Sequence, residues 1–136
     1  MNLYKTSKST LPGSNFREIR KNADKVLQKI RKNTKRKPFI RSKYFKKEKI
    51  FLNLFWQHLF GKHQGDRTRR IKYMGCAIDL IKNSVLDPST KENPNNRSEL
   101  LHRFSGITKN KDIFHVQIKE NKRTGRKDLI SIFPEK

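Results

Sequence analysis

The hydrophobic period of this chain changes along its length, and that change most restricts the folds open to it. Up to about residue 85, apolar residues recur at steps of three and four, the period of an amphipathic helix. From residue 100 onward the apolar segments are short, and two of the three alternate apolar with polar residues, which is typical of strands. Helices first and strands last indicate an α+β domain. We therefore predict N-terminal helices packed on one face of a C-terminal antiparallel sheet of three to four strands.

The expected boundaries follow from these patterns and from residues that begin or end an element. Ser14 and Asp66 are suitable N-caps, and Gly61 ends a segment that is apolar almost all round. Residues 1–13 are polar, contain a Pro-Gly pair and show no period, so we expect a flexible basic N-terminus. Residues 14–136 should then form a single domain, with helices over 14–33, 49–61 and 66–84, an exposed loop over 87–97, and strands over 99–107, 113–119 and 128–133.

The charge of the chain points to a polyanionic partner. Its 34 Lys and Arg residues against 12 Asp and Glu residues give a net charge of +22, which opposes folding unless a partner offsets it. Nucleic acid is the commonest partner of so basic a domain. The uncharged stretch that starts at Ile50 and ends before Lys62 is far shorter than the roughly 20 apolar residues of a membrane span. Because the N-terminus also lacks an apolar signal core, we expect a cytoplasmic protein without a membrane partner.

Residues 31–49 hold ten Lys or Arg residues and one acid, Glu48. This segment is either a solvated connector or a segment that grips phosphates, and the interleaved Phe39, Tyr44 and Phe45 favour the second because aromatic rings can stack on bases. Further cations crowd the start of the helix expected after Asp66, where they oppose the helix dipole unless a phosphate lies nearby. The candidate nucleic-acid-binding residues are Arg31, Lys32, Lys35, Arg36, Lys37, Arg41, Lys43, Arg67, Arg69 and Arg70.

Alternation along the expected strands places polar side chains that could take part in catalysis on one face of the sheet. His115, Gln117 and Lys119 point away from the apolar side of their strand, and Ser131 does the same on the last strand. The first strand is ambiguous: one register exposes Arg103 on this face and buries His102, and the other register brings His102 to it.

Such a face has the parts for RNA cleavage without a metal, although a polar, solvated sheet face would alternate in the same way. Histidine suits proton transfer near neutral pH, and cations stabilise the charge that develops on phosphorus. The acids are scattered singly, and the four histidines and single cysteine lack zinc-ligand spacing. We therefore expect no metal and no cofactor.

The second half of the chain resembles the superfamily of barnase, EndoU, colicin and RelE-like nucleases, in particular its phage-associated branch, abbreviated PBECR. The resemblance covers residues 67–134 and rests on the segments DRTRRIKY, HRFSGIT, FHVQIKE and LISIFP. It implies a twisted antiparallel sheet of about four strands, whose concave face cleaves RNA without a metal, often in toxins or mobile-element proteins. The positions that carry this implication are His102, Arg103, His115, Gln117, Lys119 and Ser131.

Together these observations predict a small metal-independent endoribonuclease that cleaves RNA by attack of the ribose 2′-OH, with His102 and His115 as acid and base. RNA is the expected partner, with tRNA among the candidates, and an acidic antitoxin or immunity protein would suit a toxin. Two alternatives stay open. The chain could be a non-catalytic basic protein that binds RNA or DNA, or a structural protein of a phage or mobile element.

Overall fold

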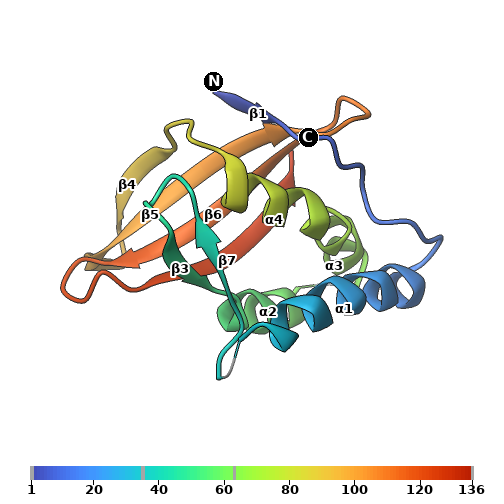
Figure 1. Ribbon diagram of the computed structural model, residues 1–136, viewed down its shortest axis with the longest axis horizontal. Coiled ribbons are helices and arrows are strands. Elements are labelled where there is room, and N and C mark those ends of the chain that lie inside the picture. Colours follow the sequence, from blue (N-terminus) through green and yellow to red (C-terminus); the bar gives the residue numbers. More distant parts are fainter. Residues whose placement is uncertain (1, 35, 63, 136) are drawn as a thin grey trace.

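The computed structural model describes residues 2–34, 36–62 and 64–135 (Figure 1). The helices are α1 (Phe16–Lys32), α2 (Asn53–Phe60), α3 (Gln64–Ile71) and α4 (Met74–Asn83). The strands are β1 (Leu3–Lys5), β2 (Phe39–Ser42), β3 (Glu48–Phe51), β4 (Ser89–Asn93), β5 (Asn96–Ile107), β6 (Ile113–Asn121) and β7 (Lys127–Pro134). None of the described helices has both the length and the apolar character needed to cross a membrane.

The seven strands form one mixed sheet, in the order β1-β5-β6-β7-β3-β2, with β4 also paired to β5. The pairs β1–β5 and β3–β7 are parallel, and the remaining pairs are antiparallel. The protein is α+β, but the prediction of N-terminal helices over a C-terminal antiparallel sheet of three to four strands is wrong. Strands from the first half of the chain enter the sheet on both sides of the C-terminal meander.

Two of these strands, β2 and β3, lie in the basic segment and at the start of the apolar segment after it, where no strand was expected. Ile50 and Phe51 belong to β3, which pairs with β2 and β7, and the helix α2 begins only at Asn53. A short run that is apolar on all sides fits a buried strand as well as a buried helix, so its period does not separate the two. The turn between β2 and β3 places Lys46 and Lys47 at φ values of 56° and 69°, which Gly or Asn usually occupies. Because lysine is not typical of such turn positions, the sequence does not indicate a turn here.

Other boundaries differ for similar local reasons. The helix expected over 66–84 is divided into α3 and α4 at Lys72, whose carbonyl accepts a hydrogen bond from the backbone N–H of Leu11 at 2.8 Å. Part of the segment expected to be flexible is therefore tied to the domain, and Leu3–Lys5 pairs with β5. The expected loop over 87–97 contains β4. Helix α1 forms where its apolar stripe predicts it, with Asn15 rather than Ser14 as the N-cap.

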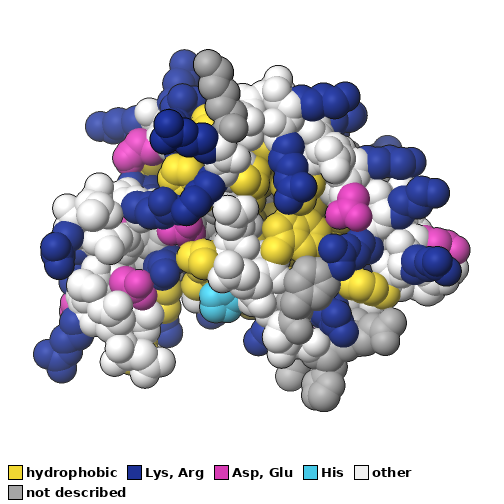
Figure 2. Space-filling model, turned by 90° about the horizontal axis from the view of Figure 1, so that it is seen from below, with side chains coloured by type: hydrophobic (Ala, Val, Ile, Leu, Met, Phe, Trp, Pro, Cys, Tyr) yellow, Lys and Arg dark blue, Asp and Glu magenta, His cyan; other side chains and the backbone are white. Residues whose placement is uncertain are grey.

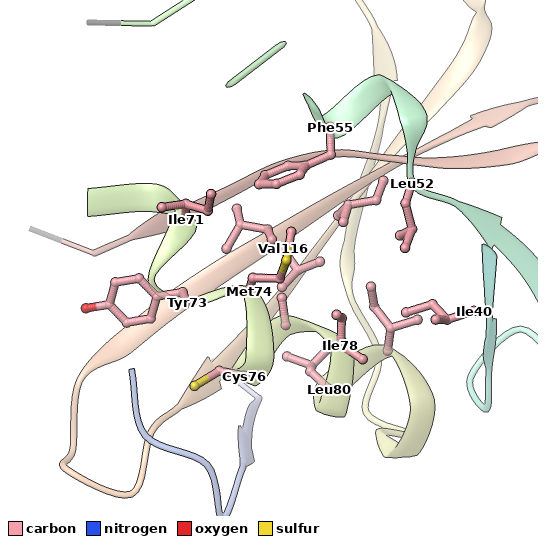
Figure 3. Close-up of a cluster of buried hydrophobic side chains, with 14 of the residues drawn as sticks. Ile40, Leu52, Phe55, Ile71, Tyr73, Met74, Cys76, Ile78, Leu80 and Val116 are labelled. Atoms are coloured by element: carbon pink, nitrogen blue, oxygen red, sulfur yellow. The ribbon is translucent and has the colours of Figure 1, made fainter. Parts of the chain in front are cut away.

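The core lies between one face of the sheet and the helices. In Figure 1, α4 passes over the sheet while α1, α2 and α3 gather below it. Phe104, Val116 and Ile118 line this face of β5 and β6 and are at most 4% exposed. Phe55 from α2, Ile71 from α3 and Leu80 from α4 join Val116 in one apolar cluster (Figure 3). The opposite face of β5, β6 and β7 is thereby left for polar side chains.

Gly106 tests this packing, because a Cβ atom at its position would lie 2.6 Å from Cζ of Phe114 and 3.0 Å from Cδ1 of Leu80. We expect Gly106→Ala to lower the free energy of unfolding by about 1–3 kcal/mol, the usual cost of overpacking a core. Urea unfolding followed by circular dichroism measures it. Gly65→Ala is the control, since nothing lies within 4 Å of a Cβ there. Equal stability of the two variants would contradict this account of the core.

Candidate functional site

The face of β5, β6 and β7 opposite the core, called the open face below, carries three cross-strand rows of side chains. Ser105, His115 and Phe133 face one another in the first row, Arg103, Gln117 and Ser131 in the second, and Leu101, Lys119 and Asp128 in the third. Neighbouring rows are two residues apart along β5 and β6, roughly 7 Å, whereas an irregularity in the pairing of β6 with β7 puts Ser131 and Asp128 three residues apart. The structure thus brings five of the predicted catalytic residues to one face: Arg103, His115, Gln117, Lys119 and Ser131.

His115 is held at both of its ring nitrogens. Nδ1 lies 2.8 Å from Oγ of Ser105, and Nε2 lies 3.2 Å from Oε1 of Glu135. A carboxylate can only accept, so a neutral ring bonded to Glu135 carries its proton on Nε2, and Nδ1 then accepts from the Ser105 hydroxyl. The ring is 8% exposed and contacts Phe133 at 5.2 Å between centroids. His115 therefore sits between a hydroxyl and a carboxylate in a fixed orientation.

Two arginines from different elements meet beside this histidine. The guanidinium of Arg103 lies 5.2 Å from the centroid of the Phe133 ring, and that of Arg70 lies 5.6 Å from it. Arg70 Nη1 donates to Oγ of Ser131 at 2.9 Å, and Arg103 Nη2 donates to Oε1 of Gln117 at 3.4 Å. Arg70, which the sequence marks only as a nucleic-acid-binding candidate, thus reaches the open face from α3.

Asp66 holds Arg70 in this position. Its Oδ2 accepts from Nε of Arg70 at 3.1 Å, and its Oδ1 accepts from Nη2 of Arg69 at 3.0 Å. Burial by itself raises the pKa of Asp66, but the hydrogen bonds and charges of Arg70 and Arg69 outweigh burial and keep the pKa below its usual value. The carboxylate therefore stays ionised down to acidic pH, and the Arg70 fork keeps its direction.

Lys119 shares the open face but not the immediate surroundings of His115. Four residues of extended strand separate them, roughly 13 Å. The Lys119 ammonium lies 3.3 Å from Oε2 of Glu99 and forms an ion pair with it, at the end of the sheet where the third row lies. A ligand bound at His115 would have to extend along the strand to reach Lys119.

His102 lies on the opposite, core-facing side of β5, in the same orientation as Phe104. Its Nδ1 is 2.8 Å from Oγ1 of Thr90, and its Nε2 is 2.7 Å from Oε1 of Glu120. The ring is 7% exposed and packs edge-on against Phe45. The structure therefore adopts the register that exposes Arg103, and it does not bring His102 and His115 to one phosphodiester.

The candidate nucleic-acid-binding residues fall into two groups rather than one cluster. The first group is exposed around the end of α1 and along β2, and consists of Arg31, Lys32, Arg36, Lys37, Arg41 and Lys43. Lys35 lies outside the described residues. The second group, Arg67, Arg69 and Arg70, lies on α3, where Arg67 is positioned over the ring of Phe16. Tyr44 and Phe45, expected as stacking surfaces, instead pack against Phe104.

Sequence reasoning did not name Glu135, and it gave Ser105 and Phe133 no role in the site. The period alone places Phe133 on the same face as Ser131, and Ser105 on the same face as Arg103. Glu135 follows the last strand, and only its backbone bond to the carbonyl of Ile113, at 2.9 Å, brings it to His115. Across the described residues, no three His, Cys, Asp or Glu side chains gather closely enough to hold a metal ion.

The placement of His102 leads to a prediction about stability. His102→Ala would leave Glu120 and Thr90 without their partner, so we expect the free energy of unfolding to fall by about 1–3 kcal/mol. RNA affinity of the folded protein should not change, because the open face is on the other side of the strand. Lys25→Ala, at an exposed position of α1, is the control in denaturant unfolding and filter binding. Weaker RNA binding at unchanged stability would count against this placement.

Comparison of this chain with models of protein families, with curated proteins and with solved structures gives no match.

Proposed function

We propose that this protein is a metal-independent endoribonuclease that cleaves RNA by 2′-OH transesterification at the open face. The observation that carries the proposal is the setting of His115, which is bound between Ser105 and Glu135 and lies beside the arginine pair on Phe133. The resemblance of residues 67–134 to the barnase, EndoU, colicin and RelE-like nucleases supports the same reaction. The phage or toxin context of that superfamily belongs to the proposal as well.

The reaction needs two proton transfers. As the 2′ oxygen forms a bond to phosphorus, the bond from phosphorus to the 5′ oxygen breaks; a base takes the proton of the 2′-OH, and an acid gives a proton to the 5′ oxygen. We assign the role of base to the Glu135 carboxylate, which takes the proton of the 2′-OH, and the role of acid to His115 in its protonated, imidazolium form. His115 becomes a neutral ring when it gives its proton to the 5′ oxygen, and the two groups meet at 3.2 Å. The products are a 2′,3′-cyclic phosphate and a 5′-hydroxyl. Positioned acids and bases each contribute roughly 10²–10⁴-fold to rate.

The arginines supply the remaining function, which is to stabilise charge on the phosphorane oxygens. Arg103 lies one row from His115 and Arg70 approaches from α3, so both forks can reach a phosphate placed at His115. Gln117 and Ser131 contact Arg103 and Arg70 respectively, and we assign them a positioning role. Lys119 would contact a neighbouring nucleotide.

The partner proposals follow from the same chemistry. RNA would be bound through its phosphates, and a cytoplasmic location would give access to it. The excess of positive charge, visible in Figure 2 as dark-blue Lys and Arg side chains spread over the face that it shows, would also favour an acidic inhibitor such as an antitoxin or immunity protein. Such an inhibitor would compete with RNA for the open face.

The experiment is incubation of the protein with total RNA and with tRNA in excess EDTA. We expect the wild type to leave 2′,3′-cyclic phosphate ends and His115→Gln to lose at least about 10²-fold in rate, because one proton transfer is removed. Lys25→Gln, at an exposed position of α1 away from the open face, is the control and should cleave normally. Unchanged circular dichroism and unfolding midpoints establish that each variant is folded.

Two outcomes would overturn the proposal. If His115→Gln cleaves as fast as the wild type, the site is elsewhere. If the wild type binds RNA with an affinity that falls with salt but yields no product at any concentration, the protein is a non-catalytic binding module.

A further inference from the structure

The hairpin of β2 and β3 presents an outward face made only of aromatic and cationic side chains, called the ribbon below. Phe39 pairs with Phe51, and Arg41 pairs with Lys49, while Ile40 and Ile50 point to the core. The ring centroids of Phe39 and Phe51 are 6.1 Å apart, edge to face. The Arg41 guanidinium and the Lys49 ammonium lie 5.4 Å and 4.7 Å from the Phe39 centroid.

Arg41 and Lys49 are like charges directly opposite each other on one face of an antiparallel pair. Such a pair is destabilising, and it is offset in part by the Phe39 ring and by a hydrogen bond from Arg41 Nη1 to the carbonyl of Lys47 at 2.9 Å. The acid of this hairpin, Glu48, is bonded to Lys127 at 2.6 Å instead. An anion that lies between or over the two cations would relieve the repulsion that remains.

Two grooves border the ribbon and extend its charge. One runs past Phe39 and Phe51 between Arg36, Lys37, Lys49 and Arg126. The other runs along Phe39 past Lys29, Arg41, Lys43, Lys47 and Lys82. Among the described residues that line these two grooves there is no Asp or Glu. A bound anion would meet cations along the whole length of both.

The groove past Phe51 borders a hollow that reaches the open face. Lys37 and Arg126 line both, and the hollow also contains Asn121 and Lys119, the latter in the third row of the open face. The two acids of that hollow are already engaged, Glu99 by Lys119 and Asp128 by Arg126. Cations therefore recur from Arg103 and Lys119 on the open face, past Arg126, to the ribbon, and this series of cations is called the path below.

We propose that this path binds one extended, unpaired strand of nucleic acid, whose phosphates follow the cations and whose bases stack at Phe39, Phe51 and the guanidinium of Arg126. The Arg126 guanidinium lies over the Phe51 ring, 4.2 Å from its centroid, so on this side of the ring a base would stack on the guanidinium. Aromatic rings and guanidinium planes take unstacked bases, which a duplex does not offer. The identification of this strand as a substrate rests on the proposed function, whereas its binding requires no chemistry at His115.

The test compares binding of fluorescent 2′-O-methyl RNA, which cannot be cleaved, as strands of about four and about sixteen nucleotides and as a duplex. We expect the long strand to bind the wild type at least about tenfold more tightly than the short strand or the duplex. Arg41→Gln with Lys49→Gln should remove most of that gain and reduce the salt slope by roughly 1.4, at about 0.7 for each lost phosphate contact. The control, Lys21→Gln with Lys25→Gln on the exposed side of α1, removes the same charge and should bind normally.

Several results would overturn the inference, and they are separable from failure of the proposed function. Equal binding of the duplex, equal losses in ribbon and control variants, or ribbon-dependent binding of anionic vesicles or an acidic peptide but not of RNA would each do so. If RNA is cleaved at His115 while strand length and the ribbon have no effect, the inference fails and the function stands. If length-dependent binding at the ribbon persists without any cleavage, the inference stands and the function fails.

Discussion

The pairing of β5 with β6 is the constraint on which the rest of the molecule depends. Their register sets Phe104 opposite Val116 on one face and Ser105 opposite His115 on the other, so a single ladder specifies both the core and the candidate site. A shift of one residue would exchange the faces, placing Arg103 in the core and Phe104 in water. Gly106 lies beneath Phe114 and Leu80, so the helix layer can approach this ladder closely.

The sequence predicts this part of the structure because a half-buried strand must alternate. Period alone places His115, Gln117, Lys119 and Ser131 on one face, and β5, β6 and β7 form where the alternation occurs. The sequence leaves the register of the first of these strands, β5, open because Leu100 and Leu101 offer an apolar residue to either face. Packing of Phe104 and His102 against Phe45 decides it in the structure.

What the sequence does not predict depends on contacts between distant segments. The strand β3 is short and is recognised by its partners β2 and β7 rather than by its own pattern. Glu135 joins His115 only through the course of the chain after β7, and Arg70 reaches Ser131 across 61 positions of sequence. Pairings of this kind have no local signal, so periodicity and capping could not supply them.

The few acids of this chain stabilise a strongly basic fold by their location. Asp66 holds Arg70, Glu99 holds Lys119, Asp128 holds Arg126, and Glu48 meets the buried Lys127. Each of these acids is next to a cation that the fold or the candidate site uses, so the few negative charges hold particular cations in place.

The edges of the sheet have a consequence for how copies of this protein meet. One edge of β5 is paired first with β4 and then with β1. The strand β1 lies near the start of the chain, whereas β4 ends at Asn93. At the other side of the sheet, β2 is the last strand, and its outer edge pairs with no strand of the described chain. Unpaired edges invite strand addition and aggregation, and charged side chains discourage it. Since β2 carries Arg41 and is followed by Lys43, two copies that approached edge to edge would bring like charges together, so the same cations that suit a polyanion also oppose pairing of this edge with a second copy.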